Sequence, residues 1–213
     1  MSELNLVRAM VRSLRSSSDV EALLRVEELT SAAAMEPLLE RMRRTEEGRR
    51  VLDERPAMNS RTVDLDRLRA LPEGTLGREY MAHLERNGLD LDALTVPVQA
   101  GPTEECNWLL ERVRQTHDLW HTVLGCSTEP YQEVLVHAFQ WSQLRMPYSA
   151  LVVVFGILKH YIGEARWRAL RRQIPMMVRA GREAEFMLGV YWEEHWEESM
   201  ASIRSRLRVV VAR

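Results

Sequence analysis

Apolar residues recur every three or four positions along most of this chain. No long segment alternates apolar and polar residues with a period of two. The first period is that of a helix with one buried face, whereas the second would indicate a half-buried strand. The pattern therefore predicts an all-α protein with no sheet beyond incidental bridges. We expect helices over the ranges 3–15, 19–31, 35–45, 46–54, 64–70, 75–86, 104–125, 130–144, 148–173 and 175–211, the last with a break near Gly181.

The length of 213 residues fits a single domain with a substantial core. We expect residues 1–35 to form an N-terminal helical extension and residues 36–213 to form a multi-helix bundle. A formal net charge of -2 gives no basis for binding nucleic acid. Cys106 and Cys126 are too few for a disulfide framework, which favours a reducing, cytoplasmic location.

No run of the sequence approaches the roughly 20 apolar residues of a membrane-spanning helix. Residues 4–14 carry an apolar stripe with arginines beside it, a composition found both in organellar presequences and in surface helices. Glu3 and Asp19 favour a packed or surface helix. Such a stripe also predicts peripheral docking on the inner face of a membrane.

His117-Asp118-x-x-His121 and the later Glu133 point to a divalent metal ion. Residues four apart share a helix face, so both imidazoles can bind one ion. Asp118 is rotated by about 100° and would be a fourth ligand or would orient a ligand. Glu133 follows a glycine and a proline, so a second, antiparallel helix would bring it opposite the histidines.

The same residues allow a second interpretation. His-Asp-x-x-His is close to the His-Glu-x-x-His of zinc proteases, in which the glutamate is a general base. Asp118 is one methylene shorter than glutamate and reaches a metal-bound water less well. A zincin-like hydrolase is therefore an alternative function.

The spacing His117-Asp118-x-x-His121-x(11)-Glu133 resembles the signature of the Coq4 family of ubiquinone biosynthesis proteins. Further segments resemble other family motifs in the same order, over roughly residues 36–213. These are Glu54-Arg55-Pro56, the block Leu71-Pro72-Glu73-Gly74-Thr75-Leu76-Gly77-Arg78-Glu79-Tyr80, the pair Arg112 and Arg114, and Tyr191-Trp192-Glu193-Glu194.

The resemblance implies an all-α Coq4-type fold and an activity on the aromatic head group of a prenylated hydroxybenzoate-type quinone precursor. The implied reaction is oxidative decarboxylation, in which a hydroxyl replaces the ring carboxyl. Partners implied are an apolar or prenylated aromatic molecule, other pathway enzymes and a second copy of the chain. The donor set suits zinc, with iron or magnesium as alternatives. A non-catalytic lipid-binding or assembly protein with a structural metal is the other main alternative.

Two side chains near the metal motif are candidates for catalysis. Arg114, like Arg112, lies close before His117 and could pair with a substrate carboxylate, with Glu133 or with solvent. His137 stands where the family commonly has a lysine, and we expect either a proton donor or acceptor or a structural histidine. Further departures from the family pattern, at Arg145, Met176, Met177 and Ala180, put the substrate in doubt and allow a related reaction in a bacterial specialised-metabolite pathway.

The composition leaves two more questions open. The chain has 11 Met and 6 Trp, which would fill the core or line an apolar pocket near the metal. An arginine-rich stretch over residues 166–182 would form a solvated helix face or meet anionic lipid head groups.

Overall fold

The structure is a computed structural model that describes residues 20–163 and 166–211. These residues form helices and no strand, with one isolated bridge between Thr75 and Ser199. The predicted all-α class is therefore confirmed. The predicted helix over residues 3–15 and its apolar stripe lie outside the described residues. The helices are α2 Val20–Ser31, α3 Met35–Met42, α4 Glu46–Glu54, α5 Leu65–Ala70, α6 Leu76–Asn87, α7 Glu104–Gln115, α8 His117–Leu124, α9 Pro130–Leu144, α10 Pro147–Gly163, α11 Trp167–Glu183 and α12 Met200–Arg206, with 3-10 turns at Ala32–Ala34, Met187–Gly189 and Trp192–Glu194.

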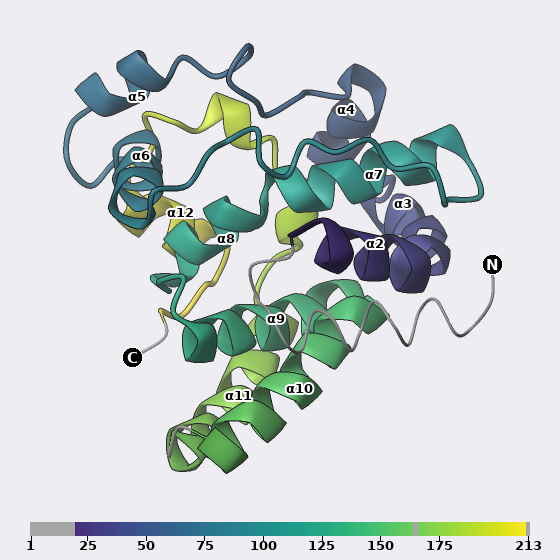
Figure 1. The fold of residues 1–213 in the computed structure, drawn as a ribbon. Coiled ribbons are helices and arrows are strands. Elements are labelled where there is room, and N and C mark those ends of the chain that lie inside the picture. Colours follow the sequence, from purple (N-terminus) through teal and green to yellow (C-terminus); the bar gives the residue numbers. More distant parts are fainter. Residues whose placement is uncertain (1–19, 164–165, 212–213) are drawn as a thin grey trace.

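Helix α9 is the centre of the arrangement (Figure 1). It packs against α10 and α11, which project together from one side of the molecule, and it contacts α8 on its other side. Helix α8 in turn packs against α6 and α12. The face between α8 and α9 is therefore the place where residues from the two predicted ligand helices meet.

Helix α2 is integrated into the bundle although it belongs to the predicted N-terminal extension. It packs against α10, and Glu27 forms a buried ion pair with Arg114 of α7. The neighbouring Glu28 carboxylate accepts hydrogen bonds from the backbone N–H groups of Gln99 and Ala100. Residues 20–31 are thus part of the same packed unit as α7.

The helix predicted over residues 104–125 is interrupted at Thr116, which is a correction. The Thr116 hydroxyl donates to the carbonyl of Arg112 at 2.9 Å, and α7 ends at Gln115. A threonine side chain that bonds the preceding turn commonly bends a helix. Helix α8 then starts at His117 and ends where Gly125 takes a left-handed conformation with φ of 70°.

The predicted boundaries after residue 148 are also wrong. Helix α10 ends at Gly163, and α11 runs from Trp167 through Pro175 to Glu183. A proline inside a helix removes one hydrogen bond, but Pro175 and Arg171 are both exposed, so water can bind the carbonyl that loses its partner.

Residues 184–199 contain two 3-10 turns but no α-helix, contrary to the prediction. Buried Gln143 replaces helical hydrogen bonds here: its amide donates to the carbonyl of Gly181 at 2.6 Å and its oxygen accepts from the N–H of Met187 at 3.2 Å. Two N–H groups of α6, those of Leu76 and Gly77, donate to carbonyls of the same segment. These long-range bonds hold the segment against the bundle.

Most of the methionines and tryptophans that the structure describes are core residues. Trp120, Trp192, Met35, Met42 and Met58 are fully buried in one continuous apolar cluster. This confirms the core interpretation for these residues. Within the described ranges, no helix is both long and apolar enough to cross a membrane.

Candidate metal centre

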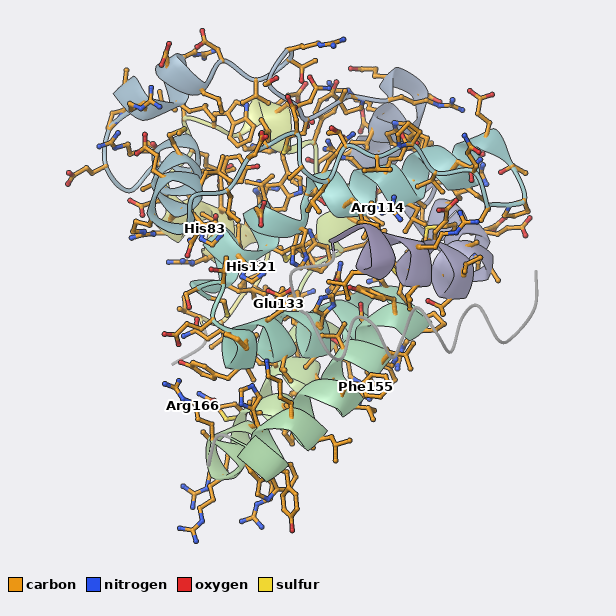
Figure 2. All side chains as sticks on the ribbon, viewed as in Figure 1. His83, Arg114, His121, Glu133, Phe155 and Arg166 are labelled. Carbon is orange, nitrogen blue, oxygen red and sulfur yellow. The ribbon has the colours of Figure 1, made fainter. Side chains whose placement is uncertain are left out.

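Glu133 lies at the centre of a group of imidazoles between α8 and α9. Pro130 occupies the first turn of α9, where a missing N–H costs nothing, and this places Glu133 one turn into the helix. From there the carboxylate points back at α8, toward His121 (Figure 2). The predicted return of Glu133 to the histidines on the following helix is therefore what the structure shows.

Three ring nitrogens approach the Glu133 carboxylate. One oxygen lies 3.0 Å from His117 Nε2 and 3.2 Å from His137 Nε2, and the other lies 3.0 Å from His121 Nε2. The Nε2 atoms of His117 and His121 are 3.1 Å apart. In the part of the chain that the structure describes, His117, Glu133 and His137 form a group whose ligand atoms all lie within 4.8 Å of one another. We call His117, His121, Glu133 and His137 the histidine cluster.

Hydrogen bonds on the far side of two rings fix which nitrogen faces the cluster. His121 Nδ1 lies 3.1 Å from the carbonyl of Ser127, which can only accept, so Nδ1 carries the proton. His137 Nδ1 lies 3.3 Å from the Ser149 hydroxyl, which itself donates to Gln140. In its neutral form each of these two rings therefore turns an unprotonated Nε2 toward Glu133.

This donor set fits a divalent cation. Two of the three imidazoles and the carboxylate present lone pairs to one another at 3.0–3.2 Å, an arrangement that is repulsive unless protons or a cation lie among them. Ligand atoms bound at about 2.0–2.1 Å around a tetrahedral ion are about 3.3 Å apart, close to the spacing found here. A ligand histidine usually donates its other N–H to a carbonyl or a polar side chain, as His121 and His137 do.

The ionisation of these groups follows their burial and mutual contact. Burial would lower the pKa of His117, but the Glu133 carboxylate beside it raises the pKa to about 9. Burial would raise the pKa of Glu133, yet His121 and His117 hold it well below its usual range. Burial lowers the pKa of His137. Without a cation, His117 therefore keeps its proton at neutral pH.

Asp118 is not part of the histidine cluster. It is half-buried, and its charge raises the pKa of His117 from a distance. Its predicted role as a fourth ligand or as a group orienting a ligand stays a prediction. A carboxylate outside the ligand set is also what a zincin-like hydrolase would need as a base.

His137 is the residue that the spacing of the motif did not assign to the metal. It lies four residues after Glu133 on α9, so both side chains share one face. That spacing was the available signal. Both of its ring nitrogens are engaged, which fits a ligand better than a proton donor or acceptor.

Arg112 and Arg114 pair with carboxylates other than those considered from the sequence. Arg112 is fully buried and forms a bidentate pair with Glu193, with Nη2 2.9 Å from Oε2. Arg114 Nε donates to Glu27 at 2.7 Å, and its other nitrogens donate to the carbonyls of Leu24 and Val96. Both guanidinium groups thus pair with carboxylates of the protein, and the predicted catalytic role of Arg114 stays a prediction.

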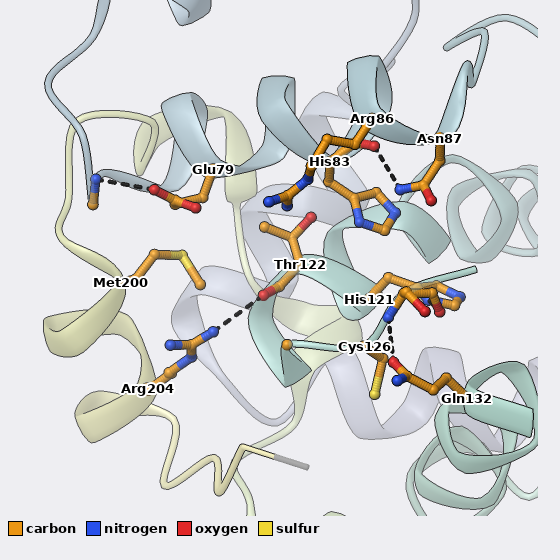
Figure 3. A pocket seen from close by; sticks show the side chains of 13 residues that line it. Glu79, His83, Arg86, Asn87, His121, Thr122, Cys126, Gln132, Met200 and Arg204 are labelled. Carbon is orange, nitrogen blue, oxygen red and sulfur yellow. Dashed lines mark hydrogen bonds between the residues drawn. The ribbon is translucent and has the colours of Figure 1, made fainter. Parts of the chain in front are cut away.

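A pocket of about 670 Å³ lies beside His121 and is lined by residues of α6, α8 and α12 and of the segment that follows α8 (Figure 3). Most of the residues that line it are polar or charged, although polar and apolar atoms contribute comparable shares of its surface. The residues that line it are Gly74, Glu79, His83, Arg86, Asn87, His121, Thr122, Gly125, Cys126, Ser127, Gln132, Met200 and Arg204. Buried His83 lies against His121, with ring centroids 5.6 Å apart, and burial lowers its pKa to about 4. No sequence spacing connects these segments.

The arginine-rich stretch lies on the projecting pair α10 and α11. Arg166, Arg168, Arg171 and Arg172 are exposed, which agrees with the solvated helix face among the expectations. On the same pair of helices Val154, Leu158 and Tyr161 are also exposed, with Tyr161 at 67%. Apolar and basic side chains are therefore presented together by this part of the molecule.

The sequence of this chain is similar to those of known proteins. The family model described as coenzyme Q (ubiquinone) biosynthesis protein Coq4 matches residues 3–212. The mitochondrial ubiquinone biosynthesis protein COQ4 homolog of Xenopus tropicalis is 37% identical over 183 residues, which are 86% of this chain and 64% of that protein. The human homolog is 35% identical over 183 residues, 85% of this chain and 68% of that protein. This chain thus spans about two thirds of the length of these relatives.

A solved structure shares the fold. It is a protein of Nostoc punctiforme PCC 73102 described in terms of ubiquinone biosynthesis, with a TM-score of 0.75 and 24% sequence identity. The similarity covers 95% of this chain and 96% of that one. The arrangement of helices is therefore one that a known protein adopts.

Proposed function

Because this chain belongs to the Coq4 family of coenzyme Q (ubiquinone) biosynthesis proteins, we propose that it is a metal-dependent enzyme acting on a hydroxybenzoate-type quinone precursor. The observation that carries the proposal is the histidine cluster, in which three imidazoles and one carboxylate converge between α8 and α9. The reaction class comes from the family resemblance. The residues supply the means to hold an ion next to a substrate.

The proposed reaction replaces the ring carboxyl by a hydroxyl. The bond between the ring and the carboxyl carbon breaks, CO2 leaves, and one oxygen atom of O2 becomes the hydroxyl. The second oxygen atom leaves as water, which requires two electrons and two protons from an external reductant. A bound divalent ion supplies Lewis acidity toward carboxylate and phenolate oxygens.

The protein groups hold and tune this site. His117, His121, His137 and Glu133 would bind the ion, and Ser127 and Ser149 would orient two of the rings. Imidazole ligands favour zinc or iron over magnesium, which prefers oxygen. Four protein ligands close a tetrahedral site, whereas a six-coordinate ion such as iron(II) keeps two positions open. A catalytic role therefore requires iron, or zinc with more than four ligands.

The test is conversion of the precursor pool in a host that lacks its own homologue. Glu133→Gln removes the central carboxylate charge and keeps the shape, so we expect conversion to be lost. Glu47→Gln is the matched control, because Glu47 also contacts a histidine, His195, but no residue of the histidine cluster. Full conversion by a folded, metal-free Glu133→Gln variant would contradict a catalytic metal.

A non-catalytic assembly protein with tetrahedral zinc is the second candidate. Four protein groups around one point are what a closed structural zinc site uses. Metal coordination by X-ray absorption separates the two candidates. Four protein ligands and no exchangeable position would favour the assembly protein, and one or two open positions would favour the enzyme.

We also propose that α10 and α11 dock on an anionic membrane surface. The exposed Leu158 and Tyr161 would enter the head-group region, and the arginines of α11 would meet lipid phosphates. Flotation with anionic liposomes is the measurement. Leu158→Asp should reduce flotation, and Val210→Asp, at another exposed apolar position, should not. Equal flotation of both variants would contradict docking through this pair of helices.

A further inference from the structure

The pocket beside His121 has a lining in which most polar groups are already satisfied. The Asn87 amide donates to the carbonyl of His83 at 2.7 Å and accepts from the Thr128 hydroxyl at 2.8 Å. The Gln132 amide accepts from the N–H of Ser127 and donates to the Tyr131 hydroxyl. These side chains shape the pocket and have little left to offer a ligand.

Two arginines keep donors available to the pocket. Arg86, on α6, makes no hydrogen bond or ion pair with any residue that the structure describes. Arg204, on α12, donates from Nε to the carbonyl of Val123 at 2.8 Å and from Nη2 to that of Thr122 at 3.3 Å. Its remaining nitrogen, Nη1, is not used in these bonds. Figure 3 shows the two guanidinium groups approaching the pocket from different helices.

His83 is the second, independent observation. Its side chain is 3% exposed, and its Nε2 is buried without a hydrogen-bond partner. Among the buried polar atoms without partners in the described residues, this is the one that belongs to a residue lining the pocket. A buried nitrogen left without a partner destabilises the protein, unless a ligand completes its hydrogen bond.

From these groups we infer a second ligand site, in which Arg86 and Arg204 bind the carboxylate of a small, soluble organic acid and His83 completes its contacts. The lining contains two positive charges, on Arg86 and Arg204, and one negative charge, on Glu79. The net charge of +1 matches a singly charged anion. The volume of about 670 Å³ lies in the usual range for small-molecule sites.

This inference goes beyond the proposed function and does not depend on it. The pocket is lined by His121 but not by His117, Glu133 or His137, so it lies beside the histidine cluster and outside it. An acid bound there would touch the outer side of one ligand ring.

Titration calorimetry with benzoate on the full-length protein tests the site, with benzamide as the uncharged analogue of the same shape. We expect benzoate to bind and benzamide to bind at least about tenfold more weakly, because only the acid pairs with the arginines. Arg86→Gln should weaken benzoate about tenfold, since a hydrogen bond between charged groups is lost. Arg61→Gln makes the same charge change at an exposed position outside the pocket and should leave affinity unchanged.

Two further variants separate this site from the metal and from a structural role. Glu133→Gln should keep benzoate binding even though it loses the metal, so failure of the proposed enzyme would leave this result intact. His83→Phe should weaken benzoate while the ligand-free protein becomes no less stable, because a buried unpaired nitrogen is removed.

The inference is overturned if benzoate does not bind, or if it binds equally to the wild-type protein and to Arg86→Gln. Loss of benzoate binding in Glu133→Gln would also overturn it, since the acid would then bind at the metal. The last titration uses inorganic phosphate. Phosphate binding more tightly than benzoate would identify free phosphate, and not an organic acid, as the ligand.

Discussion

Two groups in this protein bring histidine rings against glutamate carboxylates, and their balance of donors and acceptors is opposite. His195 lies between two carboxylates, 3.3 Å from Glu47 and 3.0 Å from Glu198. The histidine cluster instead places three rings around the single carboxylate of Glu133. In the first group two carboxylates surround one imidazole ring, and in the second three imidazole rings surround one carboxylate.

The partners of the carboxylates sharpen the difference. Glu47 accepts from the N–H of Tyr191 at 2.8 Å, and Glu198 accepts from Ser202 and Arg206. Burial would raise the pKa of both carboxyls, but these hydrogen bonds and His195 lower it. This group is satisfied by protein donors alone. In the histidine cluster the Nδ1–H groups of His121 and His137 point away from Glu133. Their Nε2 lone pairs and the carboxylate are therefore suited to binding a cation.

The comparison teaches that a buried histidine next to a glutamate does not by itself indicate a metal. What distinguishes the two groups is whether donors and acceptors already balance. A satisfied group contributes to stability, and an acceptor-rich group is suited to binding. Each prediction below tests one side of this difference.

The largest effect on stability is expected at the buried ion pair between Arg112 and Glu193. Arg112→Met leaves the Glu193 carboxylate without its bidentate partner, and breaking such a buried pair costs about 3 kcal/mol or more. Urea unfolding measures the loss, while the metal bound per folded molecule should not change. Arg50→Met removes an exposed partner from the neighbouring Glu194 and should have little effect on stability. Equal losses in the two variants would contradict this assignment.

The dependence of stability on pH should reverse when the cluster binds a metal. In the metal-free protein Glu133 raises the pKa of His117, against the effect of burial, to about 9. This contribution is fully present below the usual histidine pKa of about 6.5 and is lost as the pH rises towards 9. With metal bound, protons compete with the ion for the rings, so stability should instead rise with pH.

Thermal unfolding between pH 6.5 and 9 measures both slopes, once with a chelator and once with saturating zinc. His195→Gln should keep the reversal, because its group lies outside the cluster. Two parallel slopes in the wild-type protein would show that no ion binds at His117.

A smaller effect is expected from the hydroxyl that orients His137. Ser149→Ala removes the partner of His137 Nδ1, and loss of such an orienting bond weakens metal binding about tenfold or more. Competition with a fluorescent zinc chelator measures this change. Ser142→Ala removes another buried hydroxyl, which only bonds the carbonyl of Phe139 in its own helix, and serves as the control. Unchanged affinity in Ser149→Ala would remove His137 from the ligand set.

Sequence spacing predicted the part of the site that depends on one helix and its neighbour. His117 and His121 share a face of α8, and Glu133 returns on α9, as expected from the glycine and proline between them. His137 lies one turn after Glu133 on the same face of α9, but we expected it as a proton donor or acceptor or as a structural histidine, and not as a ligand. Asp118 lies outside the cluster because it is rotated by about 100° around the helix.

The rest depends on contacts that no spacing shows. The carboxylates that pair with Arg112 and Arg114 are 81 and 87 positions away in the sequence. The helix predicted over residues 175–211 fails after Glu183 because tertiary hydrogen bonds, those of Gln143 among them, replace the helical ones. Local periodicity is strong evidence for a helix and weak evidence for where it ends.

The most direct test of the central claim is the metal content of the purified protein, measured by elemental analysis beside that of two variants. We expect about one divalent ion per chain in the wild-type protein and in His195→Ala, whose ring belongs to the satisfied group. His121→Ala should lose the ion, because it removes one of the rings held against Glu133. Equal metal content in His121→Ala and the wild-type protein, or loss of the ion in His195→Ala alone, would contradict the account.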